Sequence, residues 1–190
     1  MYKEIKKEYA GPTGKAARKY FLESCTRTAI TSNLSPRLLN YIQSESLKGR
    51  RPESIATSIL GRFPHQDRKG VERVVRTAEG MANTAFERAR AEEIGIEWYQ
   101  WATSADSRVR PSHQKMDQVL VNWNDPPSPE ELTGEAPPGK YHAGEAEECR
   151  CIALPIASLD EVKWPAKVYR NGRIERMSRK HFREIWGGEE

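Results

Sequence analysis

Apolar residues in the first half of the chain recur at helical spacing. Ser35-Pro36 is typical of a helix start, because serine caps the first turn and proline fits the first helical position, and the apolar stripe that follows ends at Gly49. A second helix is predicted to begin at Pro52. A longer pattern, with apolar residues about every 3.6 positions, covers 66–94, and a weaker one covers 15–28. These patterns predict a layer of helices.

The second half of the chain changes to short runs that favour strands. Aromatic and β-branched residues predict strands at 96–103, 119–121 and 151–154. Pro111 is predicted to start a short helix that runs to about residue 118. Residues 124–144 hold five prolines and three glycines, so they are predicted to form a long loop whose ends are held in place.

The sequence near the C-terminus predicts a hairpin followed by a helix. Asn171-Gly172 favours a two-residue turn within 166–177, and Ser178 is a helix cap. The predicted fold class is α+β: a helical N-terminal half, then a small mixed α/β module with short antiparallel strands and a C-terminal hairpin plus helix. The predicted parts are a helical docking region, a core and a basic tail, at 1–65, 66–160 and 161–190.

Charge is unevenly distributed along the chain. The net charge is +4 over 190 residues, and the mean hydropathy is -0.81. Residues 125–148 hold seven acidic side chains and one lysine, whereas residues 163–183 hold eight basic side chains and one glutamate. An acidic loop followed by a basic tail indicates a surface for partners of different charge. No run approaches the ~18 apolar residues of a membrane span, so no membrane partner is predicted.

Two short motifs carry the candidate chemistry, one around His113 and one at Cys149-Arg150-Cys151. His113 and Asp117 lie four residues apart on the predicted helix and share a face, and the two cysteines share a face of a strand. These four side chains, His113, Asp117, Cys149 and Cys151, could ligate one zinc ion, with His142 as a further candidate. The alternative that we prefer is a hydrogen-bonded cluster of reduced thiols and imidazole that requires no cofactor.

Enzymatic interpretations of the same motifs are weaker. Cys149 or Cys151 could act as a nucleophile that His113 activates, but the sequence shows no oxyanion element beside them. A metal-dependent nuclease or toxin-like hydrolase could use His113 and Asp117, but the sequence has no second carboxylate cluster. We therefore predict that the protein is not an enzyme and has no catalytic residues.

The arginines of the first motif are interpreted as structural. Asp106 or Ser107 is predicted to accept a hydrogen bond from the free N–H groups at the start of the Pro111 helix. Arg110 or Arg150 is predicted to pair with Asp106 in a forked salt bridge. Arg108 is a further residue of the same structural motif.

The C-terminal hairpin places like charges opposite each other. A two-residue turn sets Arg170 opposite Arg173 and Lys167 opposite Arg176, which is unfavourable in an isolated ribbon. Phosphates or an acidic protein surface would relieve this repulsion, and a solvated face is the alternative. The predicted nucleic-acid or partner-binding residues are Lys167, Arg170, Arg173, Arg176, Arg179, Lys180 and Arg183.

The paired motifs resemble a known family. The run Trp101-x-Thr103-x-x-Asp106-x-Arg108-x-Arg110-Pro111-Ser112-His113-x-x-x-Asp117, followed by Cys149-Arg150-Cys151 and an apolar strand, resembles the phage Mu F-like domain of minor head (head morphogenesis) proteins. The helix with Arg76-Thr77-Ala-Glu79 resembles the Arg-Thr-Glu helix of that family. The resemblance covers roughly residues 66–156. It implies that the predicted core at 66–160 is a Mu F-like domain.

The chain departs from the family pattern at two places. Many relatives carry Cys-Pro-x-Cys where this chain has Arg110-Pro111-Ser112-His113. Many also carry His-Pro-x directly before Cys-Arg-Cys, where this chain has Ala146-Glu147-Glu148. This chain therefore lacks two thiols and one imidazole that those relatives place near the motif.

The resemblance implies a structural protein of the virion. Such a protein would bind near the portal vertex inside the capsid of a tailed phage or prophage and assist head assembly, DNA packaging or DNA ejection. The implied partners are the portal protein, the major capsid protein and viral double-stranded DNA, and the implied locations are the virion and, during assembly, the host cytoplasm. A zinc-clipped DNA-binding module is a further alternative.

Overall fold

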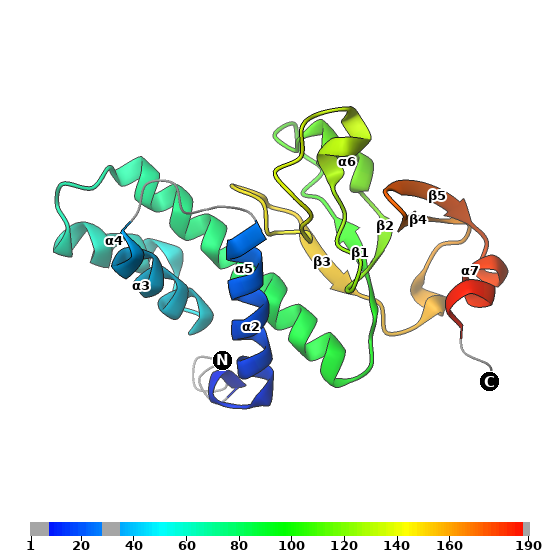
Figure 1. Ribbon diagram of the computed structural model, residues 1–190, viewed down its shortest axis with the longest axis horizontal. Coiled ribbons are helices and arrows are strands. Elements are labelled where there is room, and N and C mark those ends of the chain that lie inside the picture. The colour runs from blue at the N-terminus through cyan, green and yellow to red at the C-terminus, as the bar shows by residue number, and fades with distance from the viewer. Residues whose placement is uncertain (1–7, 28–34, 188–190) are drawn as a thin grey trace.

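Helices α2 to α5 form the N-terminal layer in the part of the chain that the structure describes. The computed structural model describes residues 8–27 and 35–187, and the parts of the predicted N-terminal region at 1–7 and 28–34 lie outside the described residues (Figure 1). The helices are α2 (Pro12–Arg27), α3 (Pro36–Leu47), α4 (Pro52–Arg62) and α5 (Arg68–Glu93). The predicted helical half is therefore confirmed for the described residues.

Local sequence signals explain where these helices begin. The side chain of Ser35 accepts a hydrogen bond from the backbone N–H of Leu38, as the Ser-Pro start predicts. Asp67 caps α5 in the same way, because its carboxylate accepts from the N–H of Gly70 at 2.7 Å. Gly95 follows α5 with a φ of 74°, a left-handed conformation that glycine adopts without strain.

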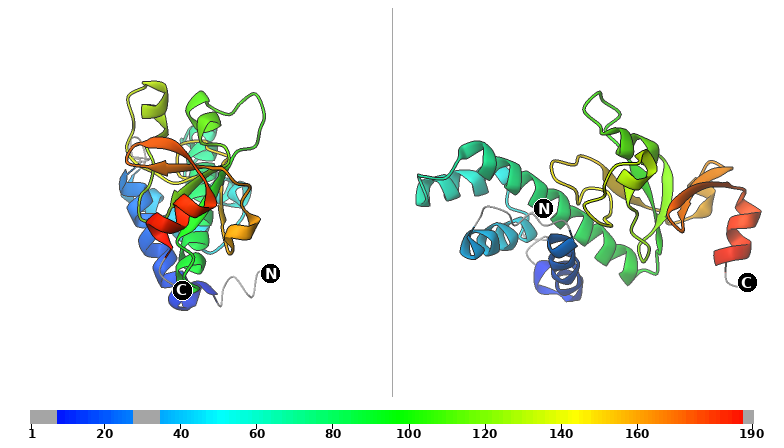
Figure 2. Two further views of the ribbon diagram at one scale, coloured as in Figure 1. Left: turned by 90° about the vertical axis from the view of Figure 1, so that its right-hand side faces the viewer. Right: turned by 45° about the horizontal axis from the view of Figure 1, so that its top comes forward.

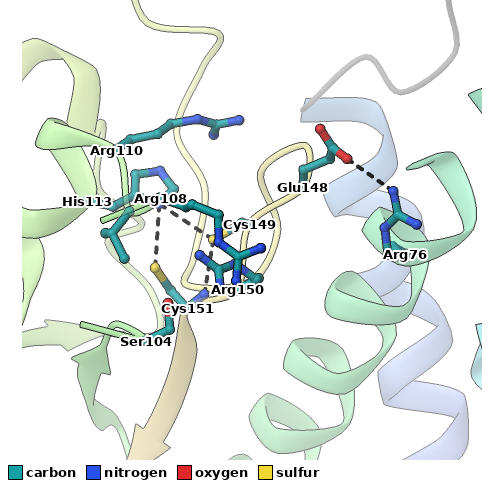
Figure 3. Close-up of a pocket in the computed structure, with 10 residues that line it drawn as sticks. Arg76, Ser104, Arg108, Arg110, His113, Glu148, Cys149, Arg150 and Cys151 are labelled. Carbon is teal, nitrogen blue, oxygen red and sulfur yellow. Dashed lines mark hydrogen bonds and ion pairs between the residues drawn. The ribbon is translucent and has the colours of Figure 1, made fainter. Parts of the chain in front are cut away.

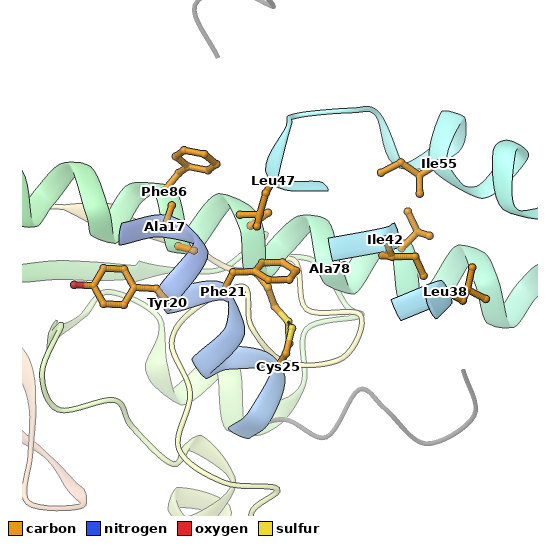
Figure 4. Packing of buried hydrophobic residues seen from close by; sticks show 14 of the residues in the cluster. Ala17, Tyr20, Phe21, Cys25, Leu38, Ile42, Leu47, Ile55, Ala78 and Phe86 are labelled. Carbon is orange, nitrogen blue, oxygen red and sulfur yellow. Dashed lines mark hydrogen bonds between the residues drawn. The ribbon is translucent and has the colours of Figure 1, made fainter. Parts of the chain in front are cut away.

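The core of this layer lies along α5. Phe21 of α2, Ile42 of α3 and Ile55 of α4 are all buried in one cluster with apolar residues of α5 such as Ala78 (Figure 4). The 26 residues of α5 span about 39 Å at 1.5 Å per residue. This length carries α5 from the helical layer to the sheet, where its C-terminal part ends beside β1 (Figures 1 and 2).

A five-stranded sheet forms the second layer, in the order β3-β1-β2-β4-β5. The strands are β1 (Trp98–Ala102), β2 (Val119–Asn122), β3 (Ile152–Pro155), β4 (Ala166–Arg170) and β5 (Arg173–Met177). All neighbouring strands pair antiparallel except β2 and β4, which are parallel. The predicted α+β fold class is confirmed, and the sheet is mixed because the connection from β3 crosses over β1 and β2 and brings β4 back in the same direction as β2.

The hairpin of β4 and β5 forms one edge of the sheet, and the last helix packs against the sheet at Trp98. The register sets Arg170 opposite Arg173 and Lys167 opposite Arg176, as the two-residue turn predicts. Helix α7 (Arg179–Trp186) packs its Phe182 ring against Trp98 of β1 at a centroid distance of 4.9 Å. The sheet thus continues across the predicted boundary at residue 160, and its second apolar core joins residues from both sides of it.

Short helices interrupt the connections of this layer. Helix α6 (Pro111–Met116) begins at the predicted proline and ends two residues before the predicted end at Gln118, which has a φ of 61°. The predicted loop 124–144 contains one 3-10 helix, η1 (Pro129–Thr133), and a second 3-10 helix, η2 (Leu159–Glu161), lies between β3 and β4. The loop is held at both of its ends, as the next section describes.

Candidate functional site

The loop that precedes Cys149 is fixed to one face of α5. Thr84 donates its hydroxyl hydrogen to the carbonyl of Ala143 at 2.6 Å, and the backbone N–H of Glu148 donates to the hydroxyl oxygen of Thr77 at 3.1 Å. Gly80 lies between these threonines, and a Cβ at this position would come within 2.5 Å of the carbonyl oxygen of Gly144. The three helical residues share one face at i, i+3 and i+7.

This attachment extends to helix α2 and to the sheet. The buried carboxylate of Glu145 accepts from the backbone N–H of His142 at 2.7 Å and from the hydroxyl of Ser24 in α2. The imidazole of His142 lies 3.1 Å from the hydroxyl of Tyr99 in β1 and packs edge-on against Trp123. The predicted role of His142 as a metal ligand is therefore not matched by its position, since these aromatic rings surround it.

The two predicted motifs meet at His113, Cys149 and Cys151. The Nδ1 atom of His113 lies 3.5 Å from the sulfur of Cys149 and 3.5 Å from the sulfur of Cys151, and the three ligand atoms all lie within 4.8 Å of one another. His113 and Cys151 are buried, and Cys149 is half-buried. The ring of Trp101 packs edge-on against the imidazole and closes the site from the sheet side.

The far side of the imidazole is held by two residues that the sequence analysis missed. The Nε2 atom of His113 lies 2.9 Å from the hydroxyl of Tyr141, and Tyr141 donates its hydrogen to the carboxylate of Glu130 at 2.5 Å. Both Tyr141 and Glu130 are buried in the loop after β2. Burial and the neighbouring carboxylate raise the pKa of Tyr141 well above its usual range, so that the hydroxyl keeps its proton.

The two thiols have pKa values that shift in opposite directions. A hydrogen bond from the Cys151 thiol, together with the nearby imidazole, lowers the pKa of Cys149. The same interaction and burial raise the pKa of Cys151, because a second thiolate beside the first is unfavourable. The backbone N–H of Cys151 also donates to the sulfur of Cys149 at 3.4 Å.

The motif arginines and Asp106 form a second contact between the two segments. Arg150 donates two hydrogen bonds to the carboxylate of Asp106, at 2.6 and 2.7 Å, which is the predicted forked salt bridge. This fork lowers the pKa of Asp106 below its usual range. Arg108 contributes its backbone N–H to the same carboxylate, whereas Arg110 donates to the carbonyl of Glu147 at 2.6 Å.

The predicted capping of α6 does not occur. Arg110 is the N-cap residue, and no side chain accepts a hydrogen bond from the first turn. The carboxylate of Asp106 is directed instead to Arg108 and Arg150. The guanidinium of Arg150 gives this carboxylate two charge-assisted hydrogen bonds at once, which holds it away from the start of the helix.

Asp117 is separated from the metal-ligating group. Its carboxylate accepts from the backbone N–H of Thr103 at 2.9 Å and from the hydroxyl of Thr103 at 2.8 Å. Helix α6 ends at Met116, and Asp117 has a ψ of 129°, so the helical spacing that would align it with His113 does not hold there. The predicted set of four ligands is thus reduced to three in the described residues.

A pocket of about 490 Å³ opens beside the three remaining ligands. Four arginines line it together with His113, Cys149 and Cys151 (Figure 3): Arg76, Arg108, Arg110 and Arg150. Arg76 comes from α5 and lies 3.2 Å from the carboxylate of Glu148. The Arg76-Thr77 pair of the sequence motif thus contacts the loop through both of its side chains.

The basic tail is partly paired within the protein. Arg176 is exposed and stands opposite Lys167 on the ribbon. Arg183 lies on α7. The other predicted cations have internal partners: Lys167 donates to the carbonyl of Asp117, Arg170 lies over the ring of Trp186, Arg173 pairs with Glu175, Arg179 with Asp160 and Lys180 with Glu184. The like charges of Arg170 and Arg173 therefore have partners within the protein, whereas Arg176 is exposed opposite Lys167.

Comparisons with known proteins point to one family. A family model described as "Phage Mu protein F like protein" matches residues 39–154. An uncharacterized protein of Haemophilus influenzae is 25% identical over 159 residues, which cover 83% of this chain and 32% of that relative. The chain therefore spans about a third of the length of this curated relative. No solved structure matches.

Proposed function

Because the chain belongs to the phage Mu protein F like family of head morphogenesis proteins, we propose that it is a minor head protein of a tailed phage or prophage. It binds near the portal vertex inside the head and assists assembly, DNA packaging or DNA ejection. The family match carries this proposal, since it spans both motifs and reaches from α3 to β3. Family membership also implies association with the virion and partners in capsid assembly.

The helical layer is the surface that we assign to the portal or the major capsid protein. It presents exposed apolar side chains, such as Leu22 on α2 with 55% of its surface exposed. Among the described helices, none has the length and apolar character that a membrane crossing requires. Leu22, together with Phe63 at the end of α4, gives this layer exposed apolar side chains that a partner protein would bury.

Co-purification with heads tests this assignment. A tagged chain is produced together with the other head genes, and purified proheads are analysed for the tag and for the portal protein. We expect the tag in few copies per particle and in complexes that contain the portal protein. Absence of the chain from purified proheads would contradict the proposed function.

A matched pair of variants locates the contact surface. Leu22→Glu changes an exposed residue of the helical layer, and Ile152→Glu changes a residue of β3 that is also 55% exposed. We expect Leu22→Glu to lower incorporation into proheads at least tenfold, because a buried unpaired charge costs several kcal/mol. Ile152→Glu should leave incorporation unchanged. The reverse pattern would assign the docking surface to the sheet.

We assign DNA contact to the ribbon of β4 and β5. Exposed Arg176 and its neighbour Lys167 present two cations side by side, which suits the phosphates of packaged double-stranded DNA. Arg176→Glu should weaken DNA binding and make its salt dependence shallower by about one phosphate contact. Lys19→Glu on α2, at a site with 71% of the side chain exposed, is the control and should change neither quantity. If both variants weaken DNA binding equally, the binding is a non-specific electrostatic attraction and the proposed contact at the ribbon is wrong.

The hydrolase alternative loses its main support. It requires His113 and Asp117 to bind one ion, and the carboxylate of Asp117 is bonded to Thr103 at the opposite end of α6. We therefore retain a role in assembly and DNA handling, and we do not assign catalytic residues.

A further inference from the structure

We propose that His113, Cys149 and Cys151 bind one zinc ion. Among the described residues these three side chains form the group with the spacing of metal ligands, and they come from two segments that the ion would join. Thiolate and imidazole are the ligands that zinc prefers in proteins.

The distances fit a tetrahedral zinc ion. Bonds of about 2.3 Å to sulfur and about 2.1 Å to nitrogen, at tetrahedral angles, place a sulfur and a nitrogen ligand about 3.6 Å apart. Both sulfurs lie 3.5 Å from the same nitrogen, Nδ1 of His113. A hydrogen-bonded pair accounts for one of these distances, because Nδ1 carries either one hydrogen or one lone pair. A metal ion between the three atoms accounts for both.

The protein fixes the imidazole in the form that binds a metal. The hydroxyl hydrogen of Tyr141 is donated to Glu130, so the hydroxyl oxygen of Tyr141 accepts from Nε2 of His113. Nε2 therefore carries a hydrogen, so that a neutral imidazole has its lone pair on Nδ1, the atom that faces the two sulfurs. Metal-ligating histidines commonly donate their other ring N–H in this way, which orients the ring and raises its affinity for the metal.

The charges balance when the ion is bound. Two thiolates and a neutral imidazole bring two negative charges, which a divalent ion neutralises. The backbone N–H of Cys151 donates to the sulfur of Cys149 at 3.4 Å. This hydrogen bond favours the ionised thiol that metal binding requires.

The fourth ligand comes from the pocket. The described residues place no further histidine, cysteine or carboxylate with these three, and all three line the pocket of about 490 Å³. An oxygen ligand from the solvent completes the tetrahedron there. The zinc site is thus a clip between α6 and the Cys149–Cys151 segment, with one side facing the four arginines of Figure 3.

Metal analysis of the purified full-length chain tests the proposal. The protein is dialysed against metal-free buffer, zinc is counted per chain, and the stripped protein is titrated with Co²⁺ while the thiolate-to-cobalt absorption is recorded. We expect one zinc per chain and a cobalt titration that saturates at one equivalent. No bound metal and no thiolate-to-cobalt absorption would overturn the proposal.

Variants separate this site from adventitious binding. Cys149→Ser and Cys151→Ser should each abolish stoichiometric binding, whereas Cys25→Ser, at the third cysteine in the helical core, should retain it. Tyr141→Phe should weaken binding about 10- to 100-fold, the range for loss of a partner behind a ligating histidine. Equal loss in Cys25→Ser would show binding unrelated to the site.

A variant that replaces one metal ligand with another tests the site even if the serine variants do not fold. His113→Cys replaces the imidazole with a third thiol, and three thiolates also bind zinc and cobalt. We expect this variant to bind one equivalent of Co²⁺ with stronger thiolate absorption than the unchanged chain. Circular dichroism of each stripped variant records whether it is folded. A folded His113→Cys variant without thiolate-to-cobalt absorption would contradict the site.

Discussion

Gly80 tests whether the Cys149 loop is held against α5 as the structure shows. An alanine Cβ at this position would lie 2.5 Å from the carbonyl oxygen of Gly144, far inside ordinary contact distance. The neighbouring atom belongs to the backbone, so a side-chain rotation cannot relieve the overlap. Helix or loop must move, and the hydrogen bonds of Thr77 and Thr84 to the loop span the point of contact.

The expected loss of stability in Gly80→Ala is about 2–4 kcal/mol. Alanine gains about 1 kcal/mol over glycine within a helix. Overpacking costs about 1–3 kcal/mol, and stretching two hydrogen bonds of about 1 kcal/mol each adds to it. The free-energy cost of the steric overlap is therefore larger than the free energy that alanine gains over glycine in a helix. For a chain of this size a change of 1 kcal/mol shifts the melting temperature by about 2–4 °C.

Gly61→Ala is the matched control for this measurement. Gly61 also lies in a helix, α4, but a Cβ there would meet no atom within 4 Å. We expect this variant to gain up to about 1 kcal/mol in urea denaturation, whereas Gly80→Ala loses stability. If both variants gain stability equally, the loop does not contact α5 at Gly80 and the reasoning about the attachment fails.

Three further changes have defined outcomes. Phe182→Ala should lower the free energy of unfolding by about 3–5 kcal/mol in urea denaturation, because its buried ring packs on Trp98; a loss below about 1 kcal/mol would show that α7 does not belong to the core. Arg150 lowers the pKa of Asp106, so this pair stabilises the fold above the unfolded pKa of about 4 and the contribution fades as pH falls below it. Asp106→Asn should remove that part of the pH dependence in acid titrations, and an unchanged profile would refute it. Tyr141→Phe should cost about 1–3 kcal/mol, measured by urea denaturation of the metal-stripped protein, because a histidine and a glutamate lose their buried partner; no change would contradict the hydrogen-bonded chain.

Elements with local signals were predicted well from the sequence. The turn at Asn171-Gly172 forms with positive φ at both residues, 51° and 79°, as a two-residue hairpin requires. The Ser178 hydroxyl accepts from the N–H of His181, which starts α7 where the cap is predicted. These signals depend on neighbours a few residues away, so tertiary structure does not override them.

Features that depend on distant segments were missed. The chain of Tyr141 and Glu130 behind the imidazole joins loop residues that follow no periodic pattern. Asp117 was assigned by helical spacing, which fails because α6 ends one residue earlier. The parallel pairing of β2 with β4 is likewise invisible in either strand alone. Each case needs the fold before the contact can be inferred.

The position of β4 has a consequence for the order in which the protein folds during synthesis. Residues 166–170 pair with β2 in the interior of the sheet, so a ribosome that has made only the first 160 residues exposes a chain whose sheet ends at β2. Trp98 and Leu120 then lack the cover that α7 and the hairpin supply. Long-range pairings of this kind form slowly, and such uncovered apolar surface is prone to aggregation. Nascent chains of this protein are therefore expected to need chaperone protection until the C-terminal segment emerges.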